Sequence, residues 1–247
     1  MAVDYDPGPG RDWEQLFQSA PLNYCENYPS KPFHTRFGPV FYRGRLDGTA
    51  RVLVVGQDPS TDEVLAHRIL IGQAGQLAQN FLSKLGLTRS YVMFNTFLFG
   101  IQSAALTNAI AIDPTITAYR NQLFDFVKLT NNITAVLAFG AYAYLSVTNW
   151  PGSSSLKVIK LSHPTSPSGV AANWNSQFPA ASSLIQPDED GHVDTSPYST
   201  TNPIPSTDIP RYDLPFGVPV WHGTGGGTHS QRGKASSFEK QIIWTAP

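Results

Sequence analysis

Residues 51–60, RVLVVGQDPS, decide the fold of this chain. The four apolar residues at 52–55 predict a strand that is buried on both faces of a parallel sheet. Gly56 ends this strand, and the loop beyond it presents Asp58 between a glycine turn and Pro59. Because ligands of open α/β sheets bind beyond the carboxyl ends of the strands, Asp58 is a candidate functional residue. The alternative is a turn aspartate without function, since Asp-Pro is a common turn signal.

Three further segments have the same character, an apolar run that ends in a polar residue or glycine. They are YVMFN at 91–95, AVLAF at 135–139 and LKVIKL at 156–161. Helical patterns lie between them, and one helix is expected to begin at Asp113-Pro114, where the aspartate caps the helix and the proline fits its first position. Strands that alternate with helices predict a three-layer α/β/α fold around a central, mostly parallel four-stranded sheet. Residues 37–42 are a candidate for a short edge strand.

The length of 247 residues and the apolar content of 41% fit a folded globular protein. We expect a single domain over residues 1–247, with a core at about 30–185 and a Pro- and Gly-rich extension at 186–247 that packs on it in part. No apolar run approaches 20 residues and the N-terminus is acidic and polar, so we expect neither a membrane span nor a secretory signal. A single cysteine, Cys25, excludes an internal disulfide and favours a reducing compartment such as the bacterial cytoplasm.

The net charge of −1 is unlike that of proteins that bind nucleic acid through bulk electrostatics. Any binding to nucleic acid must therefore rest on local basic groups and should be modest and strongly salt-dependent. Arg36, Arg43 and Arg45 cluster just before the central strand. They either contact phosphates or form a solvated basic face, and the second interpretation is the more common one for such clusters.

Polar residues follow three of the predicted strands, namely Asp58, Asn95 and His163. Parallel strands share a common carboxyl end, so these side chains should converge on one side of the sheet. A carboxylate can stabilise a developing cation or hold a water, a carboxamide can pair with the edge of a nucleobase, and a neutral histidine can donate to a developing oxyanion. Together they suit cleavage of a bond between a base and a sugar. A serine hydrolase would require a GxSxG nucleophile elbow, which the sequence lacks.

The motifs around these residues resemble those of uracil-DNA glycosylases. GQDPS at 56–60 looks like motif A of the family-1 enzymes, in which GQDP is followed by Tyr, and HPTSPSG at 163–169 is similar to their His-Pro-Ser motif. IGQAGQL at 71–77 resembles the VGxAGQL segment of the family-4 enzymes, and AVLAFGAYA at 135–143 resembles their strand and ALGA signature. The resemblance covers roughly residues 30–185, and the order and spacing of the motifs make it specific.

The resemblance implies a role for each matched residue. Asp58 would position the attacking water and stabilise the oxocarbenium-like sugar, and His163 would bind uracil O2 as charge builds on the leaving base. Gln57 would contribute its backbone N–H to the same O2. Asn95 would read O4 and N3 and so reject cytosine, whose amino group presents a donor where uracil presents an acceptor. The uracil must first be flipped out of the DNA helix.

Contacts to the DNA backbone are expected from two places. Serines after the fourth predicted strand would hold the phosphates, namely Ser162, Ser166 and Ser168. The free N–H groups of the helix that starts near Gly75 can hold another phosphate. For Gly75 the alternative is structural, a glycine that lets the helix pack closely on its neighbour.

The chain departs from the family pattern at positions that would contact the base. Ser60 stands where family-1 enzymes carry the Tyr that excludes thymine, so we expect a pocket that is less closed at uracil C5 and tolerates 5-substituted uracils. Leu70 stands where the family has a stacking Phe, so either Leu70 packs on the base or an aromatic such as Phe94 or Phe97 does so. The family's leucine wedge has no counterpart, and Val170 is the candidate for a smaller one.

We therefore expect a monofunctional glycosylase that acts as a monomer, without membrane association, on uracil-containing DNA, single- or double-stranded, and leaves an abasic site. The four cysteines that hold an iron–sulfur cluster in the family-4 enzymes are absent, so no cofactor or metal is expected. Three alternatives stay open: a glycosylase for hypoxanthine or xanthine, a non-catalytic module that binds uracil or abasic DNA, and, more distantly, a nucleotide-binding α/β protein with no role on DNA.

Overall fold

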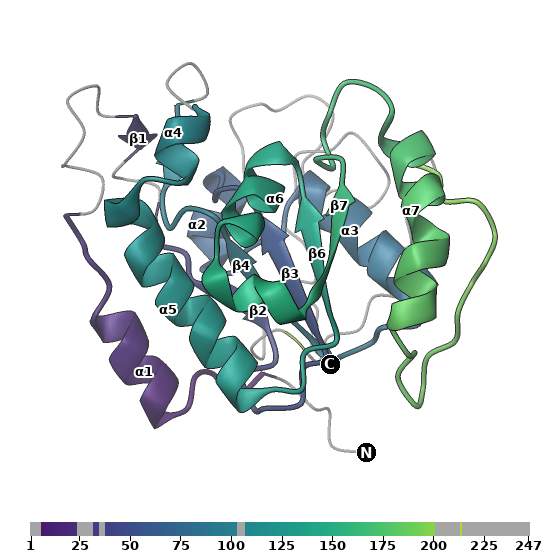
Figure 1. Ribbon diagram of the computed structural model, residues 1–247, viewed down its shortest axis with the longest axis horizontal. Coiled ribbons are helices and arrows are strands. Elements are labelled where there is room, and N and C mark those ends of the chain that lie inside the picture. The colour runs from purple at the N-terminus through teal and green to yellow at the C-terminus, as the bar shows by residue number, and fades with distance from the viewer. Residues whose placement is uncertain (1–5, 24–31, 35–37, 103–106, 201–212, 214–247) are drawn as a thin grey trace.

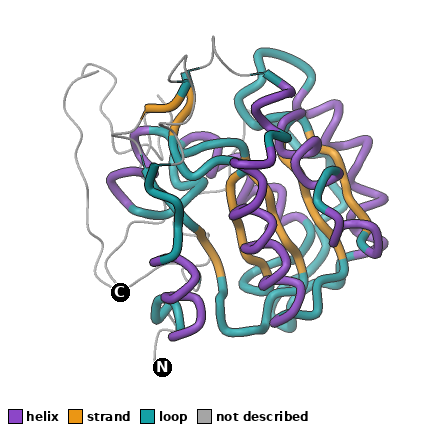
Figure 2. Tube along the Cα trace, turned by 60° about the vertical axis from the view of Figure 1, so that its left-hand side comes forward, coloured by secondary structure: helices purple, strands orange, loops and turns teal. Residues whose placement is uncertain are grey.

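The computed structural model describes residues 6–23, 32–34, 38–102, 107–200 and 213. Its centre is a five-stranded sheet with the strand order β2-β4-β3-β6-β7. These strands are β2 (Tyr42–Gly44), β3 (Val52–Gly56), β4 (Tyr91–Asn95), β6 (Ala135–Phe139) and β7 (Lys157–Leu161). Figure 1 shows helices in front of and behind this sheet, and the turned view in Figure 2 shows the strands running between helices.

The four predicted strands pair in parallel, in the order β4-β3-β6-β7. β2 adds an antiparallel partner to β4 at one edge of the sheet. The three-layer, mostly parallel fold predicted from the sequence is therefore confirmed, with one strand more than the four expected. The extra strand starts at Tyr42, the end of the candidate edge segment, whose first residue lies outside the described ranges. Pro39 has no N–H for a ladder, which is consistent with pairing that begins only beyond it.

Helices cover both faces of the sheet. They are α1 (Arg11–Gln18), α2 (Thr61–Ala66), α3 (Gln73–Lys84), α4 (Asn108–Ala111), α5 (Pro114–Thr130), α6 (Ala141–Thr148), the 3-10 helix η2 (Pro151–Ser155) and α7 (Val170–Leu184). A second, two-stranded antiparallel sheet consists of β1 (Phe33–His34) and β5 (Gly100–Ile101). Within the described ranges, none of the helices combines the length and the apolar character that a bilayer span requires.

Alternate residues of β3 face opposite helical layers. Leu53 and Val55 belong to the hydrophobic cluster that includes residues of α1, α5 and α6, whereas Val52 and Val54 belong to the cluster that includes residues of α3 and α7. All four side chains are completely buried. A strand with this pattern needs cover on both faces, which explains why the run from 52 to 55 is apolar without interruption.

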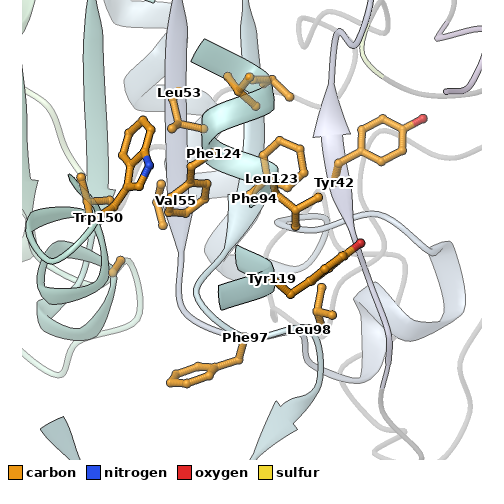
Figure 3. Packing of buried hydrophobic residues seen from close by; sticks show 14 of the residues in the cluster. Tyr42, Leu53, Val55, Phe94, Phe97, Leu98, Tyr119, Leu123, Phe124 and Trp150 are labelled. Carbon is orange, nitrogen blue, oxygen red and sulfur yellow. The ribbon is translucent and has the colours of Figure 1, made fainter. Parts of the chain in front are cut away.

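Aromatic contacts fix α5 against the sheet. Figure 3 shows Leu53 and Val55 of β3 beside Phe124 of α5 and Trp150. The ring centroids of Phe124 and Trp150 are 5.4 Å apart in an edge-on arrangement, and those of Phe94 and Phe124 are 6.5 Å apart. Such rings bury large apolar areas and prefer this geometry, so they hold the helix at a defined position over the strands.

The local capping signals of the sequence are present in the structure. Asp113 caps α5, because its Oδ1 accepts a hydrogen bond from Thr115 N at 2.8 Å, and Pro114 occupies the first helical position. Gly86, the predicted glycine at the end of α3, follows the cap residue Leu85 and has a φ of +73°. Both helix boundaries therefore follow from side chains that are adjacent in the sequence.

The arginine cluster before β3 is not the solvated face that the sequence favoured. Arg43 is completely buried, and its Nε donates to Asp213 Oδ2 at 2.7 Å, so both interpretations offered for this side chain are wrong. Arg45 pairs with Asp47 at 2.9 Å near the surface, and Arg36 lies outside the described residues. The charge pattern around Arg43 could not reveal a carboxylate that lies 170 residues further along the chain.

Residues 186–200, the described start of the predicted extension, pack against the end of α3 and the loop before β4. The carboxylate of Asp188 accepts hydrogen bonds from the three successive backbone N–H groups at 88–90 and pairs with Arg51 at 2.6 Å. Cys25 and, apart from Asp213, the remainder of the extension lie outside the described residues.

Replacement of Asp188 by Asn should lower the stability of the fold. Burial opposes ionisation of this carboxyl, but hydrogen bonds from the Ser90 hydroxyl and from the three backbone N–H groups lower its pKa from 3.8 to about 2. Loss of this charged acceptor should decrease the free energy of unfolding by about 1–2 kcal/mol and the Tm by about 2–8 °C. Because the pKa is lowered in the folded state, the advantage of the wild type is present above pH 3.8 and is lost as the pH falls through about 2.

Thermal melts of the two proteins from neutral to acidic pH measure this difference. The Tm of the Asp188→Asn variant should equal that of the wild type only at the acidic end. Equal Tm values at neutral pH would contradict a stabilising role for the Asp188 carboxylate.

Candidate active site

A pocket of about 270 Å³ lies at the carboxyl ends of the parallel strands. The predicted residues that line it are Gln57, Asp58, Ser60, Leu70, Asn95 and His163. The structure therefore brings together the three residues that were expected to converge and three of their predicted neighbours. This volume lies just below the roughly 300–1,000 Å³ typical of sites for drug-sized ligands, so the pocket suits a small ligand.

The pairing of β3 with β4 aligns two of the loops at this pocket. Gly56 is the register partner of Asn95 at the ends of the strands. Beyond this pair, Thr96 N donates to Gly56 O at 2.9 Å and Phe97 N donates to Gln57 O at 3.0 Å. The two loops therefore stay side by side beyond the sheet, and their polar side chains reach the same cavity.

Both carboxylate oxygens of Asp58 are held by the protein. Oδ2 accepts a hydrogen bond from Ile101 N at 2.9 Å, and Oδ1 accepts one from the side-chain amide of Gln57 at 3.0 Å. Burial raises the pKa of Asp58, whereas these two hydrogen bonds and the nearby His34 oppose the rise. The carboxylate is therefore oriented, as a group that acts on a bound substrate must be. Sequence reasoning missed Ile101 and His34, since they belong to the small β1-β5 sheet that it did not predict.

His163 lies just beyond β7 with its ring in the form that can donate from Nε2. Nδ1 lies 3.3 Å from Thr165 N, which can only donate to it, and 3.1 Å from the Thr165 hydroxyl, and both contacts are compatible with a neutral ring that carries its proton on Nε2. Burial lowers the pKa of His163 and so favours this neutral form. Gly140 packs against the ring at a φ of +104°, where a Cβ would lie 3.3 Å from the Cβ of His163. A neutral imidazole held in this way can donate to an oxygen that gains negative charge.

The Asn95 carboxamide packs against the Cα of Gly56. Asn95 is only 6% exposed, and a Cβ added to Gly56 would overlap its Oδ1. Within the described part of the chain no hydrogen bond engages this carboxamide, so its donor and acceptor atoms are available to a ligand in the pocket. The glycine that ends the apolar run of β3 therefore also makes room for a polar side chain of the next strand.

Leu70 reaches the pocket from the turn between α2 and α3. Its carbonyl accepts a hydrogen bond from Arg43 Nη1 at 2.6 Å, and Gly75 packs so closely on this carbonyl that any Cβ there would overlap it. Gly75 is buried and does not line the pocket, whereas Gly72 does. The absence of a side chain at Gly75 thus serves the packing of α3, and a phosphate contact by its backbone stays a prediction.

Sequence reasoning missed several residues that line the pocket, among them Asp62, Glu63 and Phe139. Phe139 is the last residue of β6 and obeys the same strand-end rule as the predicted residues. Glu63 is 5% exposed, and its Oε2 accepts a hydrogen bond from Ser60 N at 2.9 Å in a capping box of α2. Burial raises the pKa of Glu63, and the carboxylates of Asp62 and Asp58 add to this rise. The spacing of Ser60 and Glu63 was the signal that could have placed this carboxylate.

The model of the uracil DNA glycosylase superfamily matches residues 43–185, which is more than half of the chain. The chain belongs to the uracil-DNA glycosylase superfamily. All the pocket residues lie within the matched region, and the protein is accordingly a DNA glycosylase, a hydrolase of DNA repair. A comparison with curated proteins finds no match. Among the described residues of the glycosylase, no group of three or more His, Cys, Asp or Glu side chains is placed to hold a metal ion.

The serines expected to bind phosphate lie on the loop that joins β7 to α7 of the glycosylase. Ser162 N donates to Asn173 Oδ1 at 2.7 Å, and Ser166 N donates to His163 O at 2.9 Å. Ser168 is exposed. None of the three serines lines the pocket, so they border the site from outside, and their contact with DNA stays a prediction.

Three side chains considered for contact with DNA or the base do not reach the site. Phe94 and Phe97 are completely buried in the cluster on the α5 side of the sheet, whereas the side chain of Phe139 does line the pocket. Val170 is 5% exposed and packs in the cluster of α3 and α7. It does not project from the glycosylase as a wedge, so that expectation is wrong.

Replacement of Gly56 by Ala should impair the glycosylase through Asn95. The added methyl group would overlap the Asn95 carboxamide, which must then move. A displacement of about 1 Å at a contacting group can lower a rate by about 10²-fold, so we expect kcat/KM to fall about 10- to 100-fold in a cleavage assay. Gly10→Ala is the matched control, because a Cβ at Gly10 meets no atom within 4 Å. Unchanged activity of the Gly56 variant would show that the position of Asn95 is unimportant.

Proposed function

We propose that this glycosylase hydrolyses the N-glycosidic bond of uracil in single- or double-stranded DNA and leaves an abasic site. The observation that carries the proposal is one small pocket lined by Asp58, Asn95 and His163. The carboxylate can stabilise positive charge on the sugar, the carboxamide can pair with the edge of the base, and the imidazole can donate a hydrogen bond to a base oxygen. All three groups come from one chain, which supports action as a monomer.

Breakage of a glycosidic bond develops positive charge on the sugar. Asp58 stabilises this charge and positions the attacking water, with an orientation fixed by its hydrogen bonds to Ile101 N and the Gln57 amide. Asp62 and Glu63 also line the pocket. The site therefore has an acidic side, which suits a substrate that becomes cationic in the transition state.

His163 acts on the negative charge that develops on the leaving base. Its Nε2–H donates to uracil O2, while the bond from Thr165 N to Nδ1 keeps the ring in the required tautomer. The backbone N–H of Gln57 adds a second donor to the same oxygen. Loss of one such donor typically lowers kcat by about 10²–10³-fold, so the pair is a major part of the catalytic power.

Asn95 selects the base. A carboxamide offers a donor and an acceptor side by side, which matches O4 and N3 of uracil and opposes the amino group of cytosine. The base reaches this group only after it is flipped from the helix, at a cost on the order of a few kcal/mol. Leu70 and Phe139 present apolar surface in the pocket, and packing of the flipped base on them offsets part of this cost.

Ser60 leaves more room at uracil C5 than the Tyr of family-1 enzymes would. Glu63 lies beside it, since its carboxylate accepts the hydrogen bond from Ser60 N. The opening at C5 is thus polar as well as wide. We propose that it admits a small polar substituent, such as that of 5-hydroxymethyluracil, better than the methyl group of thymine.

The test of the proposed function is cleavage of a single-stranded oligonucleotide with one uracil by the wild type and by Asp58→Asn. The amide keeps the shape of the carboxylate but cannot neutralise the cation, so we expect a loss of at least about 10²-fold in single-turnover rate. Binding to the oligonucleotide should change little. Cleavage at the wild-type rate by the variant, or none by the wild type, would overturn the proposal.

A panel of oligonucleotides that each carry one altered base extends the same assay. Uracil should be cleaved fastest, 5-hydroxymethyluracil more slowly, and thymine and cytosine not measurably. Preference for hypoxanthine or xanthine would identify a glycosylase of a different base specificity. Binding of uracil or abasic DNA without any cleavage would identify a non-catalytic module.

The activity should fall on the acid side, because the mechanism requires ionised Asp58 and neutral His163. Burial raises the pKa of Asp58 above 3.8 and lowers that of His163 below 6.5. The acid limb of kcat/KM should therefore lie above pH 3.8, and the part of it that is due to His163 should lie below pH 6.5. In His163→Gln only the Asp58 ionisation should be left, with a slope of one on a logarithmic plot. An ionisation at or above pH 6.5 that is present in the wild type and lost in His163→Gln would contradict a neutral, buried His163.

A further inference from the structure

The turn at residues 67–70 carries Leu70 into the pocket. Both ends of this turn have left-handed backbone, with φ values of +52° at His67 and +51° at Leu70. Residues other than glycine rarely adopt this conformation and keep it only where the surrounding structure holds it. Two arginine side chains provide this hold, Arg43 at the Leu70 end and Arg68 within the turn.

Arg43 links the Leu70 carbonyl to a carboxylate near the end of the chain. Its Nη1 donates to Leu70 O at 2.6 Å, and its Nε donates to Asp213 Oδ2 at 2.7 Å. The side chains of Arg43 and Asp213 are both completely buried. The Tyr91 hydroxyl donates to the same Asp213 oxygen at 2.7 Å, so the carboxylate has a defined position against β4.

Arg68 links the same turn to a carboxylate near the start of the chain. Its Nη2 lies 3.2 Å from Asp6 Oδ2 and 3.1 Å from the Tyr42 hydroxyl, and its guanidinium stacks on the Tyr42 ring at 4.4 Å. The Tyr42 hydroxyl donates to Asp6 Oδ2 at 2.8 Å, and Asp6 is 4% exposed. Edge strand β2 therefore supplies both contacts of the turn, through Arg43 and through Tyr42.

Both carboxylates lie outside the region that matches the family, since it runs from 43 to 185. Neither ion pair is bidentate: Arg43 Nη2, Arg68 Nε and Asp213 Oδ1 are buried without a hydrogen-bond partner among the described residues. Buried pairs with such unsatisfied atoms are poor contributors to stability. What they do fix is geometry, because each guanidinium is planar and directs its donors at set angles.

We propose that Asp213 and Asp6 are positioning residues for the base pocket, which act through Arg43 and Arg68 on the turn that carries Leu70. Without Asp213, Arg43 would be an unpaired cation in the interior and would turn toward water, which releases the Leu70 carbonyl. Without Asp6, Arg68 would be released in the same way. The surface on which the flipped base packs then loses its fixed position. This inference rests on the proposed function of the pocket.

The test compares Asp213→Asn and Asp6→Asn with Asp188→Asn in the full chain. Asp188 also forms an ion pair, with the partly exposed Arg51, but the hydrogen bonds of the Arg51 side chain go to Ser90, Pro187 and Asp188 and not to the turn. We expect kcat on a uracil oligonucleotide to fall about tenfold or more in the two turn variants, with KM within about twofold. Inhibition by free uracil should weaken by a similar factor, because uracil occupies the pocket alone. The control should lose thermal stability while its kcat and its inhibition by uracil stay at wild-type values.

A double variant shows whether Asp213 acts through Leu70. If it does, Asp213→Asn should have little effect in a Leu70→Ala background, whereas independent roles would give additive losses. The inference is overturned if the turn variants lose only thermal stability, as the control does, or if the losses are additive. Should Asp213→Asn not fold, Asp6→Asn with its own Leu70→Ala double variant decides the question in the same manner.

Failure of the proposed function gives a different result. In that case the wild type itself does not cleave uracil, and the same set of variants is compared on whichever base of the panel the wild type removes.

Discussion

The hydrogen bonds that join the loops after β3 and β4 are the constraint on which the site depends. They continue the parallel register of Gly56 with Asn95 for two residues beyond the sheet. That register is itself set by the core, because a slip of one residue would turn Val52 and Val54 toward the opposite helical layer. The alternating burial of β3 fixes a single strand register. That register satisfies both the packing of the core and the alignment of the polar groups at the carboxyl ends of the strands.

The titratable side chains of the pocket come from two separate parts of the chain. Asp58, Asp62 and Glu63 gather on the loop and helix that follow β3, whereas His163 stands alone on the loop after β7. Burial acts in opposite directions on the two kinds of group, since it raises the pKa of Asp58 and Glu63 and lowers that of His163. The pocket therefore combines carboxylates with an imidazole for which burial favours the neutral form, in a chain with a net charge of −1.

Features that depend on neighbouring residues could be predicted from the sequence. The strands, the Asp113 cap and the convergence at the carboxyl ends of the strands all follow from periodicity and local chemistry. Features that depend on distant partners could not. Arg43 looks like a surface charge until Asp213 is placed beside it, and Ile101 reaches Asp58 only through a small sheet with no clear pattern. Phe139 could also have been predicted, because it is the last residue of a buried strand, but only polar residues at strand ends were considered.

The buried carboxylates from both ends of the chain bear on how this protein can be handled in the laboratory. A fragment cut to the limits of family similarity, 43–185, would retain Arg43 and Arg68 but neither Asp213 nor Asp6. The buried Arg43 and the half-buried Arg68 would then lack the carboxylates that pair with them. Sequence similarity therefore does not mark where this polypeptide can be trimmed.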